Sequence, residues 1–340
     1  MRRLSVRCCL LALAFGLAGC GERSGDGFDG IGASPLDGGI PGTGFLDIDG
    51  TYRMACSGEW ALAVDDDDAV NAALALGLCP FDPSDANAWG LVGARYTTPD
   101  GTGEPSSLAH GLLPGFGSSL TPRNGERLLA LSSGTARRPI DPGYERPEGA
   151  TLGTQGAPPE GFPVEFPSCD VKGEADGIAY DGAALEITLR PPPDAARVHV
   201  DVNFFTYEFP SFVCSRYNDF FVVLQSPSPD GAQMGNVAFD ANGNPISVNN
   251  TFVQACKAQD AGGKHFSRPL GTTMLEGTGY ENAAASGWLD VSSPVEPGST
   301  FTLRFAVWDS GDMILDSTVL LDNLRFEPGP RQPPSLKPLL

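Results

Sequence analysis

The heptapeptide Val198–Phe204 (VHVDVNF) alternates apolar and polar side chains along its whole length. Successive side chains of a strand point to opposite faces of a sheet, so this pattern predicts a strand with one buried face. The same alternation recurs in Leu185–Leu189 (LEITL) and in Phe301–Val307 (FTLRFAV). The second half of the chain is therefore expected to consist of strands.

Other segments extend this pattern. Phe220–Leu224 (FFVVL) is a continuous apolar run, which is typical of a strand buried on both faces. Val237–Asp240 and Ile246–Val248 flank Asn242-Gly243, a pair that favours a tight reversal and hence a hairpin. Shorter strand-sized runs occur at Leu91–Tyr96, Arg127–Leu131 and Ser317–Leu321. With 43 Gly and 30 Pro for the connections, the chain is predicted to be mostly β: a jelly-roll-like β-sandwich with long Gly/Pro-rich loops.

One helix is expected near the N-terminal end of this domain. Ala69–Leu76 is rich in Ala and Leu, follows the acidic run Asp65–Asp68, and precedes Gly77 and Pro80. Carboxylates at a helix start interact favourably with the positive end of its dipole. A Ca²⁺-binding loop is the alternative for Asp65–Asp68, but the alternating ligands and distal Glu of an EF-hand are missing.

The first residues have the order of an exported leader. A basic start at Arg2, Arg3 and Arg7 precedes the apolar run Cys8–Phe15, which is too short to span a bilayer. The following Leu-Ala-Gly-Cys resembles the lipobox of bacterial lipoproteins, which implies cleavage before Cys20 and lipid attachment to it. By analogy with lipoprotein sorting, Gly21 favours the outer membrane, with the domain on the surface or in the periplasm.

These features predict four segments. Residues 1–19 would be a signal peptide, 20–50 a flexible lipidated tether, 51–328 a β domain and 329–340 a tail. The tether is predicted because Gly, Asp, Ser and Pro cannot bury enough apolar surface to offset the entropy of ordering.

The composition is strongly acidic. The chain has 22 Lys and Arg against 42 Asp and Glu, and the leader contains three of the basic residues. Nucleic acid is therefore excluded as an expected partner, because phosphate binding needs a basic surface. The acidic excess has two interpretations, a soluble surface or carboxylates that bind Ca²⁺.

Five cysteines follow Cys20, and exported cysteines usually pair. Their spacing does not fit a zinc site. We predict the pairs Cys56–Cys79 and Cys214–Cys256, with Cys169 left over, although spacing alone leaves every other pairing open.

Carboxylates gather where the strand pattern breaks. Asp309, Asp312, Asp316 and Asp322 lie within a short span that contains Gly311. Such groups either surround a cation or cap turns through hydrogen bonds to the backbone. For Ca²⁺ we expect Asp309, Asp312 and Asp316 as ligands, joined by Glu208 and Asp219.

Aromatic residues accompany these carboxylates. Tyr207, Tyr217 and Trp308 are candidates for stacking on a glycan, because sugar C–H faces pack on rings while hydroxyls take polar partners. The alternative is that they belong to the core.

Several of these segments resemble the choice-of-anchor L domain of bacterial surface proteins. The resemblance lies in Asp181–Glu186, Asn203–Pro210, Tyr217–Phe221 and Trp308–Asn323, and more loosely in upstream strands from about Trp60. It implies a surface-exposed β domain without established catalysis. Tyr207-Glu208-Phe209 departs from the Glu-Glu-Tyr common in that family, which puts in doubt any role that needs two adjacent carboxylates there.

The function expected from these observations is not enzymatic. The chain has three histidines and lacks G-x-S-x-G, S-x-x-K and H-E-x-x-H motifs. We expect an envelope lipoprotein that presents a β-sandwich for surface adhesion or for binding a glycan or protein. The alternatives are a structural envelope protein with a protein partner, and a glycoside hydrolase that uses Glu208 and Asp219.

Overall fold

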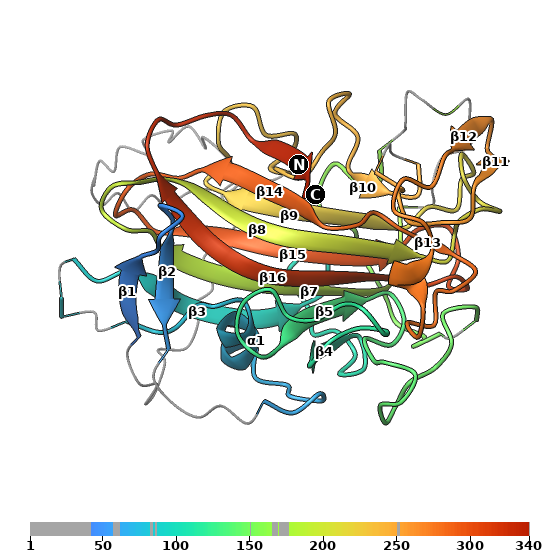
Figure 1. The fold of residues 1–340 in the computed structure, drawn as a ribbon, viewed down its shortest axis with the longest axis horizontal. Coiled ribbons are helices and arrows are strands. Elements are labelled where there is room, and N and C mark those ends of the chain that lie inside the picture. The colour runs from blue at the N-terminus through green and yellow to red at the C-terminus, as the bar shows by residue number, and fades with distance from the viewer. Residues whose placement is uncertain are drawn as a thin grey trace, which may run out of the picture.

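The computed structural model describes residues 42–56, 62–81, 84–85, 87–149, 151–164, 169, 177–249 and 252–339. The predicted leader, Cys20 and most of the predicted tether lie outside these residues. Within the described part, two large antiparallel sheets stack on each other, which confirms the predicted β-sandwich (Figure 1).

The larger sheet has nine strands. Its main order is β1 (Thr43–Leu46), β2 (Tyr52–Ala55), β16 (Ser317–Pro328), β8 (Ala195–Thr206), β14 (Leu289–Pro294) and β17 (Ser335–Pro338). Off this path, β13 (Ala284–Ala285) pairs with β8, and β5 (Leu128–Ser132) pairs with β16 and with β4 (His110–Leu113). The long pair β8–β16 forms the middle of the sheet and has no short chain connection.

The smaller sheet has six strands. Its order is β10 (Ile246–Ser247), β9 (Phe220–Ser226), β15 (Phe301–Asp309), β7 (Ala179–Arg190) and β3 (Gly90–Thr97), with β6 (Gln155–Gly156) beside β7. A separate two-stranded ribbon joins β11 (Gln259–Ala261) to β12 (Lys264–Phe266), and a 3₁₀ turn, η1, spans Thr273–Leu275.

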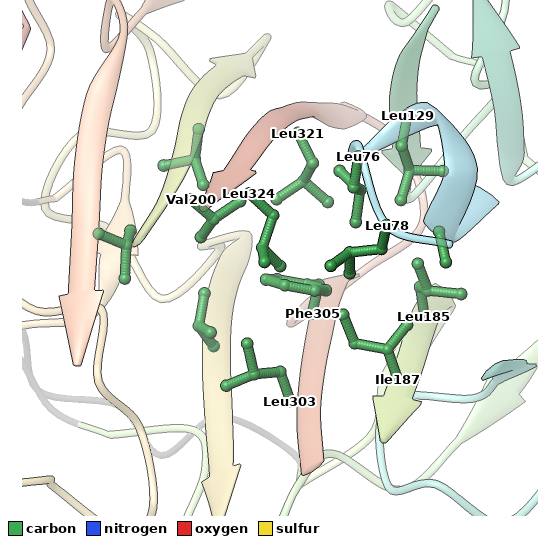
Figure 2. Close-up of a cluster of buried hydrophobic side chains, with 14 of the residues drawn as sticks. Leu76, Leu78, Leu129, Leu185, Ile187, Val200, Leu303, Phe305, Leu321 and Leu324 are labelled. Carbon is green, nitrogen blue, oxygen red and sulfur yellow. The ribbon is translucent and has the colours of Figure 1, made fainter. Parts of the chain in front are cut away.

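The main core lies between the two sheets. Figure 2 shows side chains of β7 and β15 meeting those of β8 and β16, with Phe305 among them. On β8 the apolar residues of the alternating heptapeptide face this core, as the pattern predicts. Two of the polar residues between them, Asp201 and Asn203, are also 0% exposed, because Arg123 from the loop before β5 and Met274 of η1 cover them, whereas His199 is half-buried.

The helix α1 (Ala69–Ala75) begins where the acidic run predicts. The carboxylate of Asp68 caps it by accepting a hydrogen bond from the backbone N–H of Val70 at 2.8 Å. Asp66 accepts hydrogen bonds from the backbone of Asp68 and the side chain of Asn71. The four aspartates therefore form a helix start, as predicted.

Three local expectations differ from the structure. Residues 43–46 of the predicted tether form β1, and residues 335–338 of the predicted tail form β17, because each segment pairs with a strand at the edge of the sheet. The expected hairpin around Asn242-Gly243 does reverse the chain, but its arms meet only in an isolated bridge between Phe239 and Pro245. The second arm pairs with β9 instead.

Of the two predicted disulfides, one is confirmed and one is wrong. Cys56 and Cys79 are bonded, and join the end of β2 to the chain that follows α1. Cys214 pairs with Cys169, whose Cα lies 5.1 Å away, and not with Cys256. Cys256 is a free thiol buried in an apolar cluster with Phe209 and Phe266, a contact that cysteine spacing cannot reveal.

Helices in the described part of the chain are too short or too polar to cross a bilayer.

Candidate metal centre

Pairing between β9 and β15 gathers the acidic residues at one end of the sandwich. These strands are antiparallel neighbours with Trp308 opposite Phe220, so the end of β15 lies beside the start of β9. Asp309 is the last residue of β15 and Asp219 immediately precedes β9. Glu208 follows the end of β8, which brings a carboxylate from the other sheet to the same place.

Three carboxylates form a compact cluster. One oxygen from each of Glu208, Asp309 and Asp312 lies within 4.8 Å of the others. Glu208 and Asp309 are each 1% exposed, and Asp312 is half-buried. We call these three residues the acidic triad.

Buried oxygens of the triad lack donors. Within the described residues, neither carboxylate oxygen of Asp309 accepts a hydrogen bond from a donor group, and the same holds for Oε2 of Glu208. Asp309 can hydrogen bond to Asp219 only when it keeps its proton. Both polar side-chain atoms of Asn218 and the hydroxyl of Ser310 are also unpartnered. Buried polar groups in folded proteins are almost always satisfied, so these atoms make the triad a candidate ligand site.

The pKa values of the triad carboxyl groups also favour a ligand site. Burial raises the pKa of Glu208 to about 9, with the charges of Asp219 and Asp312 adding to the effect. Burial, with Asp219 the next cause, raises the pKa of Asp309 far above its ordinary value. Buried carboxyl groups that lie close to other carboxylates either stay protonated or bind a cation, whose charge offsets their repulsion.

Asp219 and Asp316 lie beside the triad and are not members of it. Asp219 is 0% exposed, its Oδ2 accepts a hydrogen bond from the hydroxyl of Ser133 at 3.3 Å, and its Oδ1 is unpartnered. The Oδ2 of Asp316 is also unpartnered, and burial raises the pKa of Asp316 to about 9. Of the five predicted metal ligands, the structure groups Glu208, Asp309 and Asp312 and leaves these two adjacent.

Asp322 is separate from the cluster. Its Oδ2 accepts hydrogen bonds from the backbone of Arg123 at 2.6 Å and of Asn124 at 3.4 Å. The alternative interpretation, turn capping, therefore describes this residue. It also applies to one oxygen of Asp312, which accepts from the backbone of Ile314 at 3.1 Å.

Asn218 and Ser310 are site residues that the sequence prediction missed. The backbone N–H of Asn218 donates to the carbonyl of Ser310 at 3.1 Å, which joins the two strand ends next to the triad. The only sequence signal for them is that each adjoins a predicted ligand, Asp219 or Asp309.

The prediction that Trp308 stacks on a ligand is wrong. Its side chain is 0% exposed, with its ring stacked on Phe220 at 5.3 Å and edge-on to Phe162 at 5.9 Å. It lies in the strand β15, and Phe162 from the loop after β6 and Phe220 from β9 cover its ring. Tyr207 and Tyr217 are half-buried. The hydroxyl of Tyr207 hydrogen bonds to Glu148, and Arg216 covers the ring of Tyr217.

Glu208 and Asp219, the pair considered for glycoside hydrolysis, are 1% and 0% exposed. Among the described residues, both carboxylates are therefore buried away from solvent.

The fold and this buried acidic end define a two-sheet β-sandwich with a candidate cation site at one end. Residues 174–327 match the family model of the choice-of-anchor L domain. This match supports a choice-of-anchor L domain over these residues, and all five predicted metal ligands lie within the matched range. The match does not reach the upstream strands for which the sequence suggested a looser resemblance. Searches of curated proteins and of solved structures returned no match.

Proposed function

We propose that this protein is a non-catalytic binding module of the cell envelope that is stabilised by Ca²⁺ at the acidic triad. The observation that carries the proposal is Asp309, which is 1% exposed, has no described donor to either carboxylate oxygen, and can share a hydrogen bond with the neighbouring carboxylate Asp219 only while one of the two is protonated. An ionised carboxylate buried in this way needs an opposing charge.

The donor set suits Ca²⁺ best. The triad offers only oxygens, and the nearby Asn218 and Ser310 add an amide oxygen and a hydroxyl. Ca²⁺ takes six to eight oxygen ligands in flexible geometry, whereas zinc in proteins favours nitrogen and sulfur. Mg²⁺ retains several waters, which a mostly buried site disfavours.

The role of the ion would be structural. Glu208 follows a strand of the nine-stranded sheet, whereas Asp309 ends a strand of the six-stranded sheet. A shared cation would therefore tie the two sheets together at this end and hold the connecting loops in one arrangement. A rigid end of this kind is what a surface module needs to present a ligand-binding face.

A melting experiment tests this role. The protein is stripped with a chelator, dialysed, and melted with and without millimolar Ca²⁺, with Mg²⁺ in a parallel sample. Binding to the folded state alone raises stability by about 2.7 kcal/mol at a free concentration one hundred times the Kd, so the Tm should rise clearly. An unchanged Tm in Ca²⁺ would refute the proposal.

The proposal includes a lipid anchor at Cys20. It is supported by the basic and apolar leader and by the small residues before this cysteine. Intact mass analysis of protein extracted from membranes should find a chain that begins with acylated Cys20, and Cys20→Ser should move the protein out of the detergent phase. An unmodified N-terminus would remove the anchor and the outer-membrane location from the proposal.

The ligand in this proposal is a glycan or a protein of the envelope. Half-buried Tyr207 and Tyr217 stay candidates for contact with it. Glycan-array binding without a co-purifying protein would identify the ligand as a glycan. One reproducible envelope partner without glycan binding would identify it as a protein.

A further inference from the structure

A groove distinct from the acidic triad lies on the outer face of the nine-stranded sheet. Its volume is about 980 Å³. β1 and β2 line it with Phe45 and Arg53, and β16 lines it with Asn323. Its lining is completed by Asp47, Leu270, Trp288, the loop 119–124 and residues of η1.

Ion pairs and hydrogen bonds, one of them to a buried carboxylate, hold the polar groups of the groove. The Nε of Arg123 donates to Oδ2 of buried Asp201 at 2.6 Å. Arg53 donates to Oδ2 of Asp49 at 3.1 Å and to the side-chain oxygen of Asn323. These arginines are therefore charge-balanced and pre-organised, which suits them to hydrogen bond with a neutral ligand.

The backbone at Asn323 is strained. Its φ is 55°, in the left-handed region that favours glycine, and it lies at an irregularity of β16 between Asp322 and Arg325. The bulge brings its side chain between Asp201, to which it donates at 2.9 Å, and Arg53. Strain of this kind persists where surrounding contacts enforce it, and is common at binding sites.

Apolar side chains provide the rest of the lining. Phe45 is 43% exposed and Leu270 is 41% exposed, although both are large and apolar. The guanidinium of Arg123 lies 5.3 Å from the centre of the Trp288 ring. The groove thus combines an exposed aromatic ring with fixed donors and acceptors.

We infer that this groove binds a neutral saccharide chain. Sugars present C–H faces that pack on aromatic and aliphatic side chains, and hydroxyls that pair with fixed polar groups. The net charge of −20 disfavours a polyanionic ligand. The inference deepens the proposed function, because it names the ligand class of the module and its site.

Affinity electrophoresis tests the inference. The purified protein is run, with Ca²⁺ present, through gels that contain β-1,3-glucan, galactomannan or xylan, and through a gel that contains the polyanion alginate. At least one neutral polymer should retard migration. Retardation by alginate alone, or by none of the four polymers, overturns the inference.

Two variants locate the binding. Phe45→Ser removes the exposed ring, and Ser119→Trp fills the groove from an exposed loop position. Each should weaken binding about tenfold or more, the loss expected for one aromatic contact. Ile140→Ser is the matched control, because Ile140 is 80% exposed and does not line the groove. Equal binding by all three variants would contradict the assignment to this groove.

The Ca²⁺ response of each variant is measured by melting in parallel. Retained saccharide binding without a Ca²⁺ response contradicts only the metal proposal. A retained Ca²⁺ response without saccharide binding contradicts only the groove.

Discussion

Asp309 is a buried carboxyl whose ionised form no cation in the described chain offsets. Replacing it with Asn should have two opposite effects, because the amide removes both the repulsion and the ligand. In chelator, the free energy of unfolding of Asp309→Asn should be higher than that of the unmodified protein. Adding Ca²⁺ should not raise the stability of the variant. Urea denaturation in both conditions measures these effects, with the exposed Asp230→Asn as the control. A Ca²⁺ response of unchanged size in Asp309→Asn would contradict the assignment.

His110 gives a pH dependence that is independent of the metal. It is 4% exposed and stacks on Tyr96 at 3.7 Å, and burial lowers its pKa from 6.5 to about 4, against the opposing charge of Asp67. Between these values the unfolded chain binds a proton that the folded chain does not. Stability should therefore fall as the pH drops from 6.5 toward 4, by about 1.4 kcal/mol per pH unit from this group.

The variant His110→Phe, which keeps the stacked ring, isolates that contribution. Its free energy of unfolding should depend less steeply on pH between 6.5 and 4.5 than that of the unmodified protein. Parallel slopes for the two proteins would show that His110 is not buried in its neutral form.

At the scale of single residues, the sequence predicted which carboxylates come together better than it predicted exposure. Asp309 and Asp312 are recognisable because they are close together in one loop, and their partner Glu208 was identified from a separate break in the strand pattern. Trp308 was misassigned because a strand residue beside a polar loop can face either the core or solvent. Only the packing of Phe162 and Phe220 on its ring decides between them.

Among the elements, α1 offers a direct test of a local rule. Asp68 supplies the hydrogen bond that caps the helix, and the first turn contains no other acidic residue. Asp68→Ala should cost about 1 kcal/mol of stability, the usual loss for an N-cap. Chemical denaturation should detect it, whereas Asp230→Ala, at an exposed position, should change stability little. Equal stabilities would mean that the cap contributes nothing.

The spacing of the cysteines in the sequence does not predict which of them form disulfides. Cys169 and Cys214 are 45 residues apart, and their pairing depends on the loop before β7 reaching the loop before β9. Non-reducing peptide mapping should find Cys56 linked to Cys79 and Cys169 linked to Cys214. Cys256 should react with an alkylating reagent only after unfolding, because its thiol is buried. A Cys214–Cys256 peptide would contradict the structure.

At the scale of the whole molecule, alternation and turn residues were enough to predict a β-sandwich but not its assembly. The pairing of β8 with β16 joins segments more than a hundred residues apart, and alternation does not identify a partner strand. The edge strands β1 and β17 were missed because their sequences are short and rich in Gly, Pro and polar residues. The outer face of β8 was predicted to be exposed, yet a covering loop and an ion-pair network bury Asp201 and Asn203.

The central claim is that a cation joins the two sheets at the acidic triad, and a crystal structure of the protein grown in Ca²⁺ tests it most directly. The claim predicts a strong peak of density between Glu208, Asp309 and Asp312, with oxygen ligands 2.3–2.6 Å from it, as is usual for Ca²⁺. Absence of such a peak, with the three side chains turned apart or bonded to one another through protons, would contradict it.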